Sequence, residues 1–273
     1  MTDVTEQPDK WASRGIDITK PSIARAYDVV LHGKDNFEAD RAFVAQITEV
    51  IPEIYDVAAH NRHILGRGVR HLAELGIRQF LDLGSGLPTV ENTHQVAQRH
   101  TPDANVVYID NDPIVLAHGR ALLAENDHTT VVTADLRDPA TVLNDPNVTR
   151  LIDLDRPVAV LLVGILHHLH DDEDPKGIVD AYMNAVPSGS HLFITHFCAS
   201  SPQARDAEKQ YLALLGTGRF RTIEEITDYF DGLQLLQPGI VPLPLWRPDG
   251  PVPPEHELSV GQKLMYGGLA RKP

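Results

Sequence analysis

Five short apolar runs, rich in β-branched or aromatic residues and separated by about 20 to 30 residues, constrain the fold of this chain most strongly. They lie at 79–83, 105–109, 129–133, 157–163 and 190–196. Helical patterns occupy 89–100, 113–126 and 175–186 between them, and this spacing is typical of β–α–β crossovers. Because the runs are almost continuously apolar, we expect helices on both faces of the sheet. The pattern predicts a doubly wound, mainly parallel α/β fold.

The segments on either side of this core differ in character. Residues 1–19 are polar and predict a flexible arm, whereas 21–33, 38–50 and 54–75 show helical spacing of apolar residues. We therefore divide the chain into an arm with a helical lid at 1–76 and a Rossmann-like domain at 77–273, joined as one structural unit. The tail adds helices near 202–215 and 222–230.

Two further strand-like runs, 233–236 and 263–269, raise the predicted sheet to seven strands. Between them lies a proline-rich insert at 238–254 with seven prolines. Proline lacks the N–H that a central strand must donate, so we expect an ordered, extended loop there.

Composition narrows the range of partners. The chain carries 38 acidic and 24 basic residues, a net charge of −14, and no basic stripe, which argues against nucleic acid. The longest apolar run, 157–166, is about half of the roughly 20 residues that a membrane span needs. The first residues do not resemble a signal peptide, and Cys198 has no cysteine to pair with. We expect a cytoplasmic protein without membrane contact.

The sequence FLDLGSGLPT at 80–89 is the strongest motif for chemistry. A buried strand runs into a turn with Gly84 and Gly86 and then into a helix. In open α/β sheets, ligands bind beyond the carboxyl ends of the strands, where glycines allow close approach of the backbone. A glycine turn on its own is equally well explained as a purely structural feature.

Two more acids strengthen the functional interpretation. Asp110 ends the second predicted strand, where a carboxylate accepts hydrogen bonds from a ribose diol. Asp135 follows the third strand, where an acid followed by Leu136 suits the edge and face of an adenine. Each acid alone is more often a turn residue or helix N-cap. Together with Asp82 they predict an adenosine-binding crevice.

These residues resemble a known enzyme family. Asp82-x-Gly84-x-Gly86, the two later acids and ILHHLHDD at 165–172 are similar to class I S-adenosylmethionine-dependent methyltransferases over about 77–200. The segments PSIARAYDVVLHGKDNFEADR, NRHIL, VVYIDNDPIVLAHGRALL and ADLRDP extend the similarity to a bacterial S-adenosyl methyltransferase family long labelled as of unknown function. The resemblance implies a Rossmann-like methyltransferase fold and S-adenosylmethionine as cofactor, but no particular substrate.

The resemblance also implies roles for individual residues. The methionine part of the cofactor would border Asp82 and the glycine turn. Its ribose would meet the residues at the end of the second strand, and its adenine those after the third strand. The residues after the fourth strand would lie beneath the cofactor. The residues concerned are Asp82, Gly84, Ser85, Gly86, Asp110, Asn111, Asp135, Leu136, Leu166 and His167. Leu87-Pro88 replaces the third glycine of many relatives, which mildly favours S-adenosylmethionine over NAD.

The helical lid would close over this cofactor. Its candidate contacts are Tyr27, Lys34, Asn36, Asn61 and Arg62. A solvated helix cap explains the segment HGKDN at 32–36 equally well, and a surface salt bridge explains Arg62.

The histidine-rich segment HHLHDDEDP at 167–175 suggests a metal site, but adjacent histidines point in different directions and acids before Pro175 are typical of a helix start. We therefore predict no metal. A general base is the more plausible role, and the candidates are His167, His168 and His196.

The sequence thus predicts an S-adenosylmethionine-dependent methyltransferase that acts on an O or N nucleophile of a small molecule. We expect the proline-rich insert, with Trp246, to enclose an apolar pocket together with the lid. One alternative is an NAD(P)-dependent oxidoreductase, although the C-terminal half has no Tyr-x-x-x-Lys pair. Another is a module that binds S-adenosylmethionine without catalysis. The oligomeric state stays open.

Overall fold

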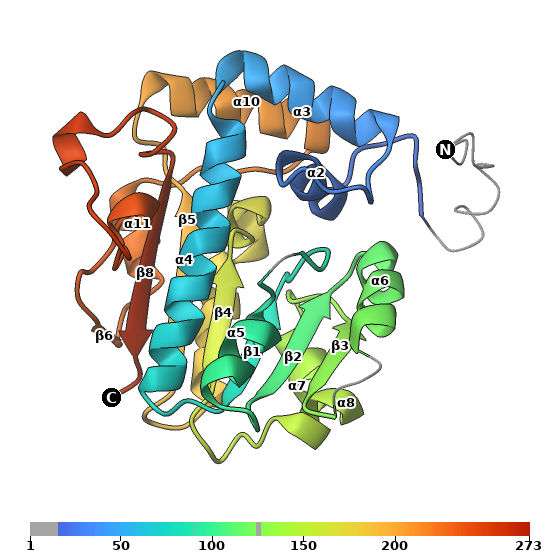
Figure 1. Cartoon of the computed structure of the whole chain (residues 1–273), viewed down its shortest axis with the longest axis vertical. Coiled ribbons are helices and arrows are strands. Elements are labelled where there is room, and N and C mark those ends of the chain that lie inside the picture. Colours follow the sequence, from blue (N-terminus) through green and yellow to red (C-terminus); the bar gives the residue numbers. More distant parts are fainter. Residues whose placement is uncertain (1–15, 90, 124–126) are drawn as a thin grey trace.

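A computed structural model describes residues 16–89, 91–123 and 127–273. Its centre is a mostly parallel sheet with strand order β3-β2-β1-β4-β5-β8-β6, and β7 also pairs with β8 (Figure 1). The strands are β1 Gln79–Leu83, β2 Asn105–Asp110, β3 Thr129–Thr133, β4 Ala159–Val163, β5 His191–Phe197, β6 Gln234–Leu235, β7 Val241–Pro242 and β8 Met265–Arg271. Strands β1 to β5 run parallel, and β8 is antiparallel to β5. The predicted fold class is confirmed.

The helices alternate with the first five strands, as the spacing predicted. The α-helices are α2 Ile23–Val30, α3 Glu38–Val50, α4 Ile54–Glu74, α5 Thr93–His100, α6 Pro113–Leu123, α7 Pro139–Asn144, α8 Pro146–Leu151, α9 Pro175–Ala185, α10 Pro202–Leu215 and α11 Ile223–Asp228. Short 3₁₀ helices are η1 Leu166–His168, η2 Asp171–Glu173, η3 Leu243–Leu245 and η4 Glu255–Glu257. The predicted arm lies outside the described residues, apart from its last four positions.

The sheet has eight strands rather than the predicted seven. The additional strand, β7, lies within the proline-rich insert and pairs only with β8. Its two residues end in Pro242, which is consistent with the confinement of proline to sheet edges.

Helices α7 and α8 were also missed, between β3 and β4. Each begins with proline directly after an aspartate N-cap: Asp138 accepts a hydrogen bond from the Thr141 N–H, and Asp145 accepts one from the Asn147 N–H. This pairing of an aspartate cap with proline in the first turn is a recognised start signal. The helices have only six residues each, too few for a clear apolar period.

Alternate strand residues supply two separate cores. In β1, Phe80 packs in the cluster that includes α4 and α5, whereas Leu81 and Leu83 pack in the cluster with α7, α8 and α9. This alternation follows from the two-residue period of a strand. Asp82 therefore points toward α4 and α5, on the same face as Phe80.

Helix α4 packs closely on the sheet, although the sequence analysis grouped it with the lid. Its Ile64, Val69 and Leu72 are almost fully buried in the core that contains Phe80. At Gly68 a Cβ atom would overlap the Phe193 ring of β5, so the helix approaches the sheet more closely than a larger residue allows.

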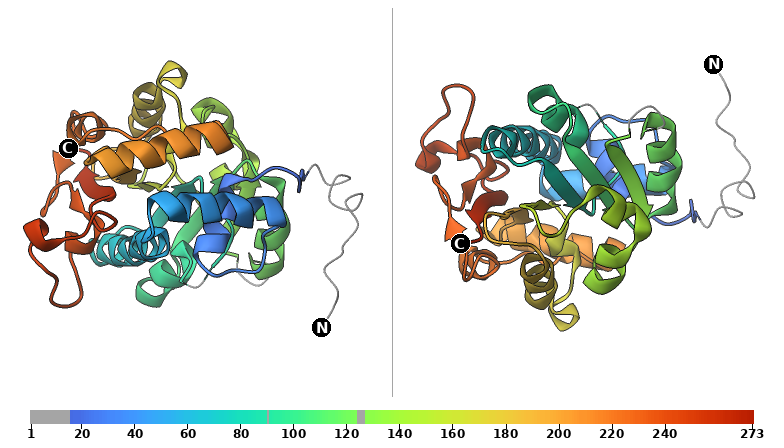
Figure 2. Two further views of the ribbon diagram at one scale, coloured as in Figure 1. Left: turned by 90° about the horizontal axis from the view of Figure 1, so that it is seen from above. Right: turned by 90° about the horizontal axis from the view of Figure 1, so that it is seen from below.

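Helices α2, α3 and α10 form a roof at the carboxyl ends of the parallel strands. Seen from above, α3 and α10 lie side by side, although about 150 residues separate them (Figure 2). The Phe43 ring of α3 meets the Tyr211 ring of α10 edge-on, with centroids 5.4 Å apart. The roof therefore combines the N-terminal lid with a helix from the C-terminal third of the chain.

Candidate active site

A cavity of about 470 Å³ lies between the roof and the carboxyl ends of β1, β2 and β4. Its volume is within the usual range for small-molecule sites. The strand ends contribute Asp82, Gly84, Ser85, Gly86, Asp110, Asn111 and His167, all of which the sequence analysis selected. Leu166 is fully buried and does not line the cavity.

The two glycines of the turn serve different purposes. Both have positive φ angles, +71° at Gly84 and +68° at Gly86, which an L side chain rarely adopts. A Cβ at Gly84 would overlap the side chain of Ile165, whereas a Cβ at Gly86 would meet no atom within 4 Å. Gly84 therefore permits packing, and Gly86 leaves open space beside the turn.

Asp82 is a buried carboxylate at the floor of the cavity. It is 5% exposed, and its Oδ2 accepts a hydrogen bond of 2.7 Å from the Thr93 hydroxyl at the start of α5. Burial raises its pKa to about 6, against the opposing effects of the Thr93 hydrogen bond and the charge of Arg62. A cationic ligand group next to Asp82 would favour its charged form.

Asp110 ties the turn to the end of β2. Its Oδ2 accepts a hydrogen bond of 2.8 Å from the Gly86 N–H, and its Oδ1 accepts one of 2.9 Å from the Asp112 N–H. Burial nevertheless raises the pKa of Asp110. Each carboxylate oxygen keeps a second lone pair, so this side chain can still accept hydrogen bonds from a diol.

Asp135 and Leu136, expected beside an adenine, are not among the described residues that line the cavity. The Asp135 carboxylate instead accepts hydrogen bonds from Arg137 Nε at 2.9 and 3.0 Å, and this arginine lowers the pKa of Asp135. Arg137 also pairs with Glu173. The assignment of these two residues to the adenine stays a prediction.

Leu87, in place of the third glycine, has a clear structural role. It is 5% exposed and packs in a small apolar cluster with Ile16 and Ala24 from the N-terminal segment and with Ile114 and Val115 of α6. The side chain therefore docks the lid onto the glycine turn, which a third glycine could not do.

The predicted lid contacts divide into two groups. Tyr27, Asn61 and Arg62 line the cavity. Asn61 is 3% exposed and connects three elements, because its Oδ1 accepts a hydrogen bond from the Thr195 hydroxyl of β5 and its Nδ2 donates one to the Tyr27 hydroxyl of α2. Arg62 donates a hydrogen bond to the backbone oxygen of Glu91.

Lys34 and Asn36 do not line the cavity. Lys34 is exposed, and Asn36 donates to the buried Asp28, which also accepts from the Asp35 N–H. At Gly33 a Cβ would overlap the Asp28 carboxylate. The segment at 32–36 therefore closes the end of α2, the structural alternative that the sequence left open.

Only two of the three candidate bases reach the cavity. His167 and His168 line it, and burial lowers the pKa of His167 well below its usual value and that of His168 to about 3. His168 Nδ1 lies 3.0 Å from the Thr217 hydroxyl, whereas His167 Nδ1 is buried and has no hydrogen-bond partner. Both imidazoles are therefore neutral near pH 7.

His196 is fully buried and does not line the cavity. Its Nε2 lies 3.2 Å from Arg221 Nη1, and its Nδ1 lies 2.7 Å from the backbone oxygen of Phe197. Because an arginine only donates, Nε2 is the acceptor and Nδ1 carries the proton. Both ring nitrogens are thus engaged away from the cavity.

Arg221 is a residue that the sequence analysis missed. It is 4% exposed and donates hydrogen bonds to the backbone oxygens of Leu166 and Leu169 and to Asp171. It thereby holds η1, with its two cavity histidines, in place. An arginine within the segment GTGRFRT at 216–222 gives no local signal of this role.

The prediction that the proline-rich insert forms a second wall of the pocket is wrong. The proline-rich insert does not line the cavity, and Trp246 is fully buried against Phe193 with ring centroids 5.1 Å apart. Arg67 of α4 fixes the insert by donating hydrogen bonds to the backbone oxygens of Trp246 and Leu243. Tyr211, Leu215 and Thr217, on and after α10, form the wall instead.

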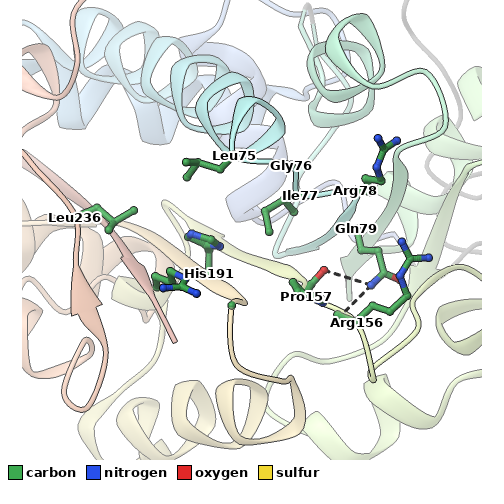
Figure 3. A pocket seen from close by; sticks show the side chains of 11 residues that line it. Leu75, Gly76, Ile77, Arg78, Gln79, Arg156, Pro157, His191 and Leu236 are labelled. Atoms are coloured by element: carbon green, nitrogen blue, oxygen red, sulfur yellow. Dashed lines mark hydrogen bonds between the residues drawn. The ribbon is translucent and has the colours of Figure 1, made fainter. Parts of the chain in front are cut away.

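Another cavity, of about 380 Å³, lies at the opposite edge of the sheet, near the amino ends of β1, β4 and β5 (Figure 3). Arg78, Arg156, Arg271 and His191 line it, together with the connection from α4 to β1. Asp82, Asp110 and Asp135 do not line this second cavity.

The described part of the chain meets neither the requirements of a metal-binding cluster nor those of a bilayer-spanning helix. Residues 16–89, 91–123 and 127–273 contain no group of three or more histidine, cysteine or acidic side chains suited to a metal ion. Within the same ranges, no helix has both the length and the apolar character needed to cross a bilayer.

Comparison with known proteins agrees with the resemblance seen in the sequence. A family model described as S-adenosyl methyltransferase matches residues 9–273. A crystal structure from Thermobifida fusca YX, provisionally described as a methyltransferase, is 51% identical, with a TM-score of 0.92 over 96% of this chain and 98% of that one. A DUF574 family protein from Streptomyces avermitilis is 38% identical, with a TM-score of 0.89 over 94% of this chain and 99% of that one.

Proposed function

The chain belongs to the S-adenosyl methyltransferase family, and we propose that it transfers the methyl group of S-adenosylmethionine to an oxygen or nitrogen atom of a small molecule. The observation that carries this proposal is the convergence of Asp82, the glycine turn and Asp110 on one cavity beneath a helical roof.

The residues present suit the cofactor. Gly86 leaves open space beside the turn, Asp110 has lone pairs for the two ribose hydroxyls, and Asp82 offers a buried carboxylate to the ammonium group of the amino-acid end. Arg62 lines the same cavity and would meet the cofactor's carboxylate. His167, with its unpartnered Nδ1, would lie beneath the cofactor.

When bound, S-adenosylmethionine supplies a methyl group on a sulfonium, which is transferred by in-line displacement. The chain's own contribution is then chiefly positioning and exclusion of water. Leu87 and its apolar partners hold the lid over the turn, and Asn61 fixes Tyr27 against the strand ends. These contacts would align an acceptor with the methyl group.

His168 and His167 are the proposed general bases. Both imidazoles line the cavity in neutral form, so each ring can accept a hydrogen bond from the acceptor. Because burial lowers the pKa of both rings, proton transfer to either one would require the bound ligands to raise that pKa toward neutrality. The Thr217 hydroxyl either donates to or accepts from His168 Nδ1, and in the tautomer whose Nδ1 donates, Nε2 is left as the acceptor. His196, held by Arg221, would act only through packing.

Calorimetric titration separates this function from its main alternative. We expect S-adenosylmethionine and S-adenosylhomocysteine to bind and NAD to fail. Asp110→Asn should weaken binding by roughly 1.5–3 kcal/mol, the typical value of a charge-assisted hydrogen bond. Asp103→Asn, which alters an exposed carboxylate paired with Arg78, is the matched control and should leave binding unchanged. Binding of NAD alone would overturn the proposal.

Transfer of a labelled methyl group into metabolite extracts separates an enzyme from a module that only binds the cofactor. We expect the label to appear in small-molecule products. If S-adenosylmethionine binds but no label is transferred across a broad extract, the non-catalytic interpretation holds instead.

A further inference from the structure

The cavity has a charged part and an uncharged part. Its acidic and basic side chains come from the N-terminal segment, from Arg62 of α4 and from the ends of β1 and β2. Among the described residues, those contributed by α3, α10, β5 and β8 are all uncharged. We call this uncharged part the aromatic chamber; it comprises Phe43, Val44, Ile47, Phe197, Tyr211, Leu215 and Met265.

The rings of the chamber form a connected wall. Tyr211 lies 5.4 Å from Phe43 and 5.5 Å from Phe197, centroid to centroid, and both pairs meet edge-on. Phe197 continues to the His167 ring at 4.4 Å, and Tyr211 to the His168 ring at 6.4 Å. Such a wall offers both ring faces and ring edges to a planar ligand.

Charge is poorly tolerated in these surroundings. Phe43 is 4% exposed, and its helix supplies no cation or carboxylate to the cavity. A charged group moved from water into an apolar site costs several kcal/mol unless it is paired. A carboxylate or an ammonium group on the acceptor would meet no partner here.

Polar atoms beside the chamber include those of the two imidazoles and the hydroxyl groups of Thr217 and Tyr211. A neutral imidazole nitrogen accepts a hydrogen bond from a hydroxyl group, and His168 Nε2 is such an acceptor when Nδ1 donates to Thr217. These positions therefore suit an acceptor with one hydroxyl at the rim of an apolar body.

We propose that the aromatic chamber binds an uncharged aromatic acceptor whose hydroxyl group faces His167 and His168. This inference rests on the proposed function, because the bound cofactor would occupy the charged part of the cavity. In the reaction, the acceptor oxygen forms its bond to the methyl carbon while the carbon–sulfur bond breaks with its electron pair going to sulfur, and the hydroxyl proton passes to an imidazole nitrogen.

Four small molecules of similar size, each with two fused six-membered rings, test the proposed chemical class of the acceptor. The protein is first saturated with S-adenosylhomocysteine and then titrated with 2-naphthol, 2-naphthoate, 2-naphthylmethylammonium and decahydro-2-naphthol. We expect 2-naphthol to bind about 10-fold more tightly than either charged probe, because a charge would lose its hydration without a partner. We expect it to exceed the saturated alcohol by about 3-fold through ring contacts.

Variants of helix α10 and of helix α3 test whether 2-naphthol binds in the aromatic chamber. Tyr211→Ala should weaken 2-naphthol binding by about 5-fold or more and change S-adenosylhomocysteine binding less than about 2-fold. Leu212→Ala is the matched control: the same helix loses an apolar side chain that is 36% exposed, and neither affinity should change. Phe43→Leu keeps an apolar side chain at the chamber and serves if Tyr211→Ala does not fold.

The outcomes distinguish this inference from the proposed function. If S-adenosylhomocysteine fails to bind, the proposed function fails, and the same probes titrated into the protein alone still test the chamber. Tighter binding of the carboxylate or the ammonium probe overturns the inference even when the cofactor product binds. An unchanged affinity of 2-naphthol in Tyr211→Ala and Phe43→Leu overturns it as well.

Discussion

Replacement of Asp82 by asparagine should stabilise the cofactor-free protein. The pKa of this carboxyl rises from 3.8 to about 6 on folding, mainly through burial. A raised pKa in the folded state means that ionisation favours the unfolded chain, so the cost grows as pH rises from 3.8 toward 6 and is complete above that range. With about 1.36 kcal/mol per pKa unit, the ionised carboxylate costs about 3 kcal/mol at pH 7.5 and about 1 kcal/mol at pH 4.5.

Urea unfolding of wild type and Asp82→Asn at both pH values measures this difference. Asparagine keeps an oxygen that accepts the Thr93 hydrogen bond and carries no charge. We expect the variant to be more stable than wild type by about 3 kcal/mol at pH 7.5 and by only about 1 kcal/mol at pH 4.5. At pH 7.5 this corresponds to an increase in melting temperature of roughly 6–12 °C for a chain of this size.

The control for this experiment is Asp103→Asn, since the Asp103 carboxylate is 63% exposed. Its stability should change by less than about 0.5 kcal/mol at either pH. The Asp82→Asn variant should also lose part of the stabilisation that S-adenosylmethionine gives to wild type, because the ammonium group of the ligand loses its charged partner. A variant no more stable than wild type at pH 7.5 would refute the claim that the buried charge is costly.

Two further experiments test the turn and the segment beneath the cavity. Gly84→Ala should destabilise the protein by more than about 3 kcal/mol in urea unfolding, because its methyl group would overlap Ile165 at a positive φ angle. Gly86→Ala should cost only about 1–2 kcal/mol of stability, because the new methyl group enters open space beside the turn. The same methyl group should weaken S-adenosylhomocysteine binding about 10-fold in calorimetry. Equal losses of stability in the two variants would contradict the different roles assigned to Gly84 and Gly86. Arg221→Met should lose about 2–4 kcal/mol of stability, since it leaves the backbone oxygen of Leu169 and the buried His196 Nε2 without their donor, whereas Arg78→Met, at an exposed ion pair, should lose less than about 0.5 kcal/mol.

The parts of the site that depend on short sequence segments were predictable. The strand, the turn and the positions of Asp82, Gly84, Gly86 and Asp110 follow from local patterns, because parallel strands bring their carboxyl ends to one edge. His167 could also be selected from its place after the fourth strand.

Contacts between distant segments were not predictable. Tyr211 reaches the cavity only because α10 crosses the roof beside α3, and no local pattern encodes that crossing. His196 lies near the end of a strand, like Asp82 and Asp110, yet it does not line the cavity and contacts Arg221 instead. Leu87 was noted as a departure from the glycine pattern, but its partner Ile16 is about 70 residues away.

The segment HGKDNF at 32–37 shows that a resemblance to a family does not by itself assign a role to each residue. Its residues match the family closely, which suggested lid contacts at Lys34 and Asn36. In the structure neither residue lines the cavity: Lys34 is exposed, and Asn36 closes the end of α2, where Asp28 accepts hydrogen bonds from the Asp35 N–H and the Asn36 side chain. A segment typical of a family is thus compatible with a structural role as well as with ligand binding.

A crystal structure of the protein with S-adenosylhomocysteine would show which cavity holds the cofactor product. We expect ribose hydroxyls within hydrogen-bond distance of Asp110, the amino-acid end beside Asp82, and the sulfur atom facing the aromatic chamber. Ligand density at the opposite edge of the sheet, between Arg78 and Arg271, with the cavity under the roof empty, would contradict this expectation.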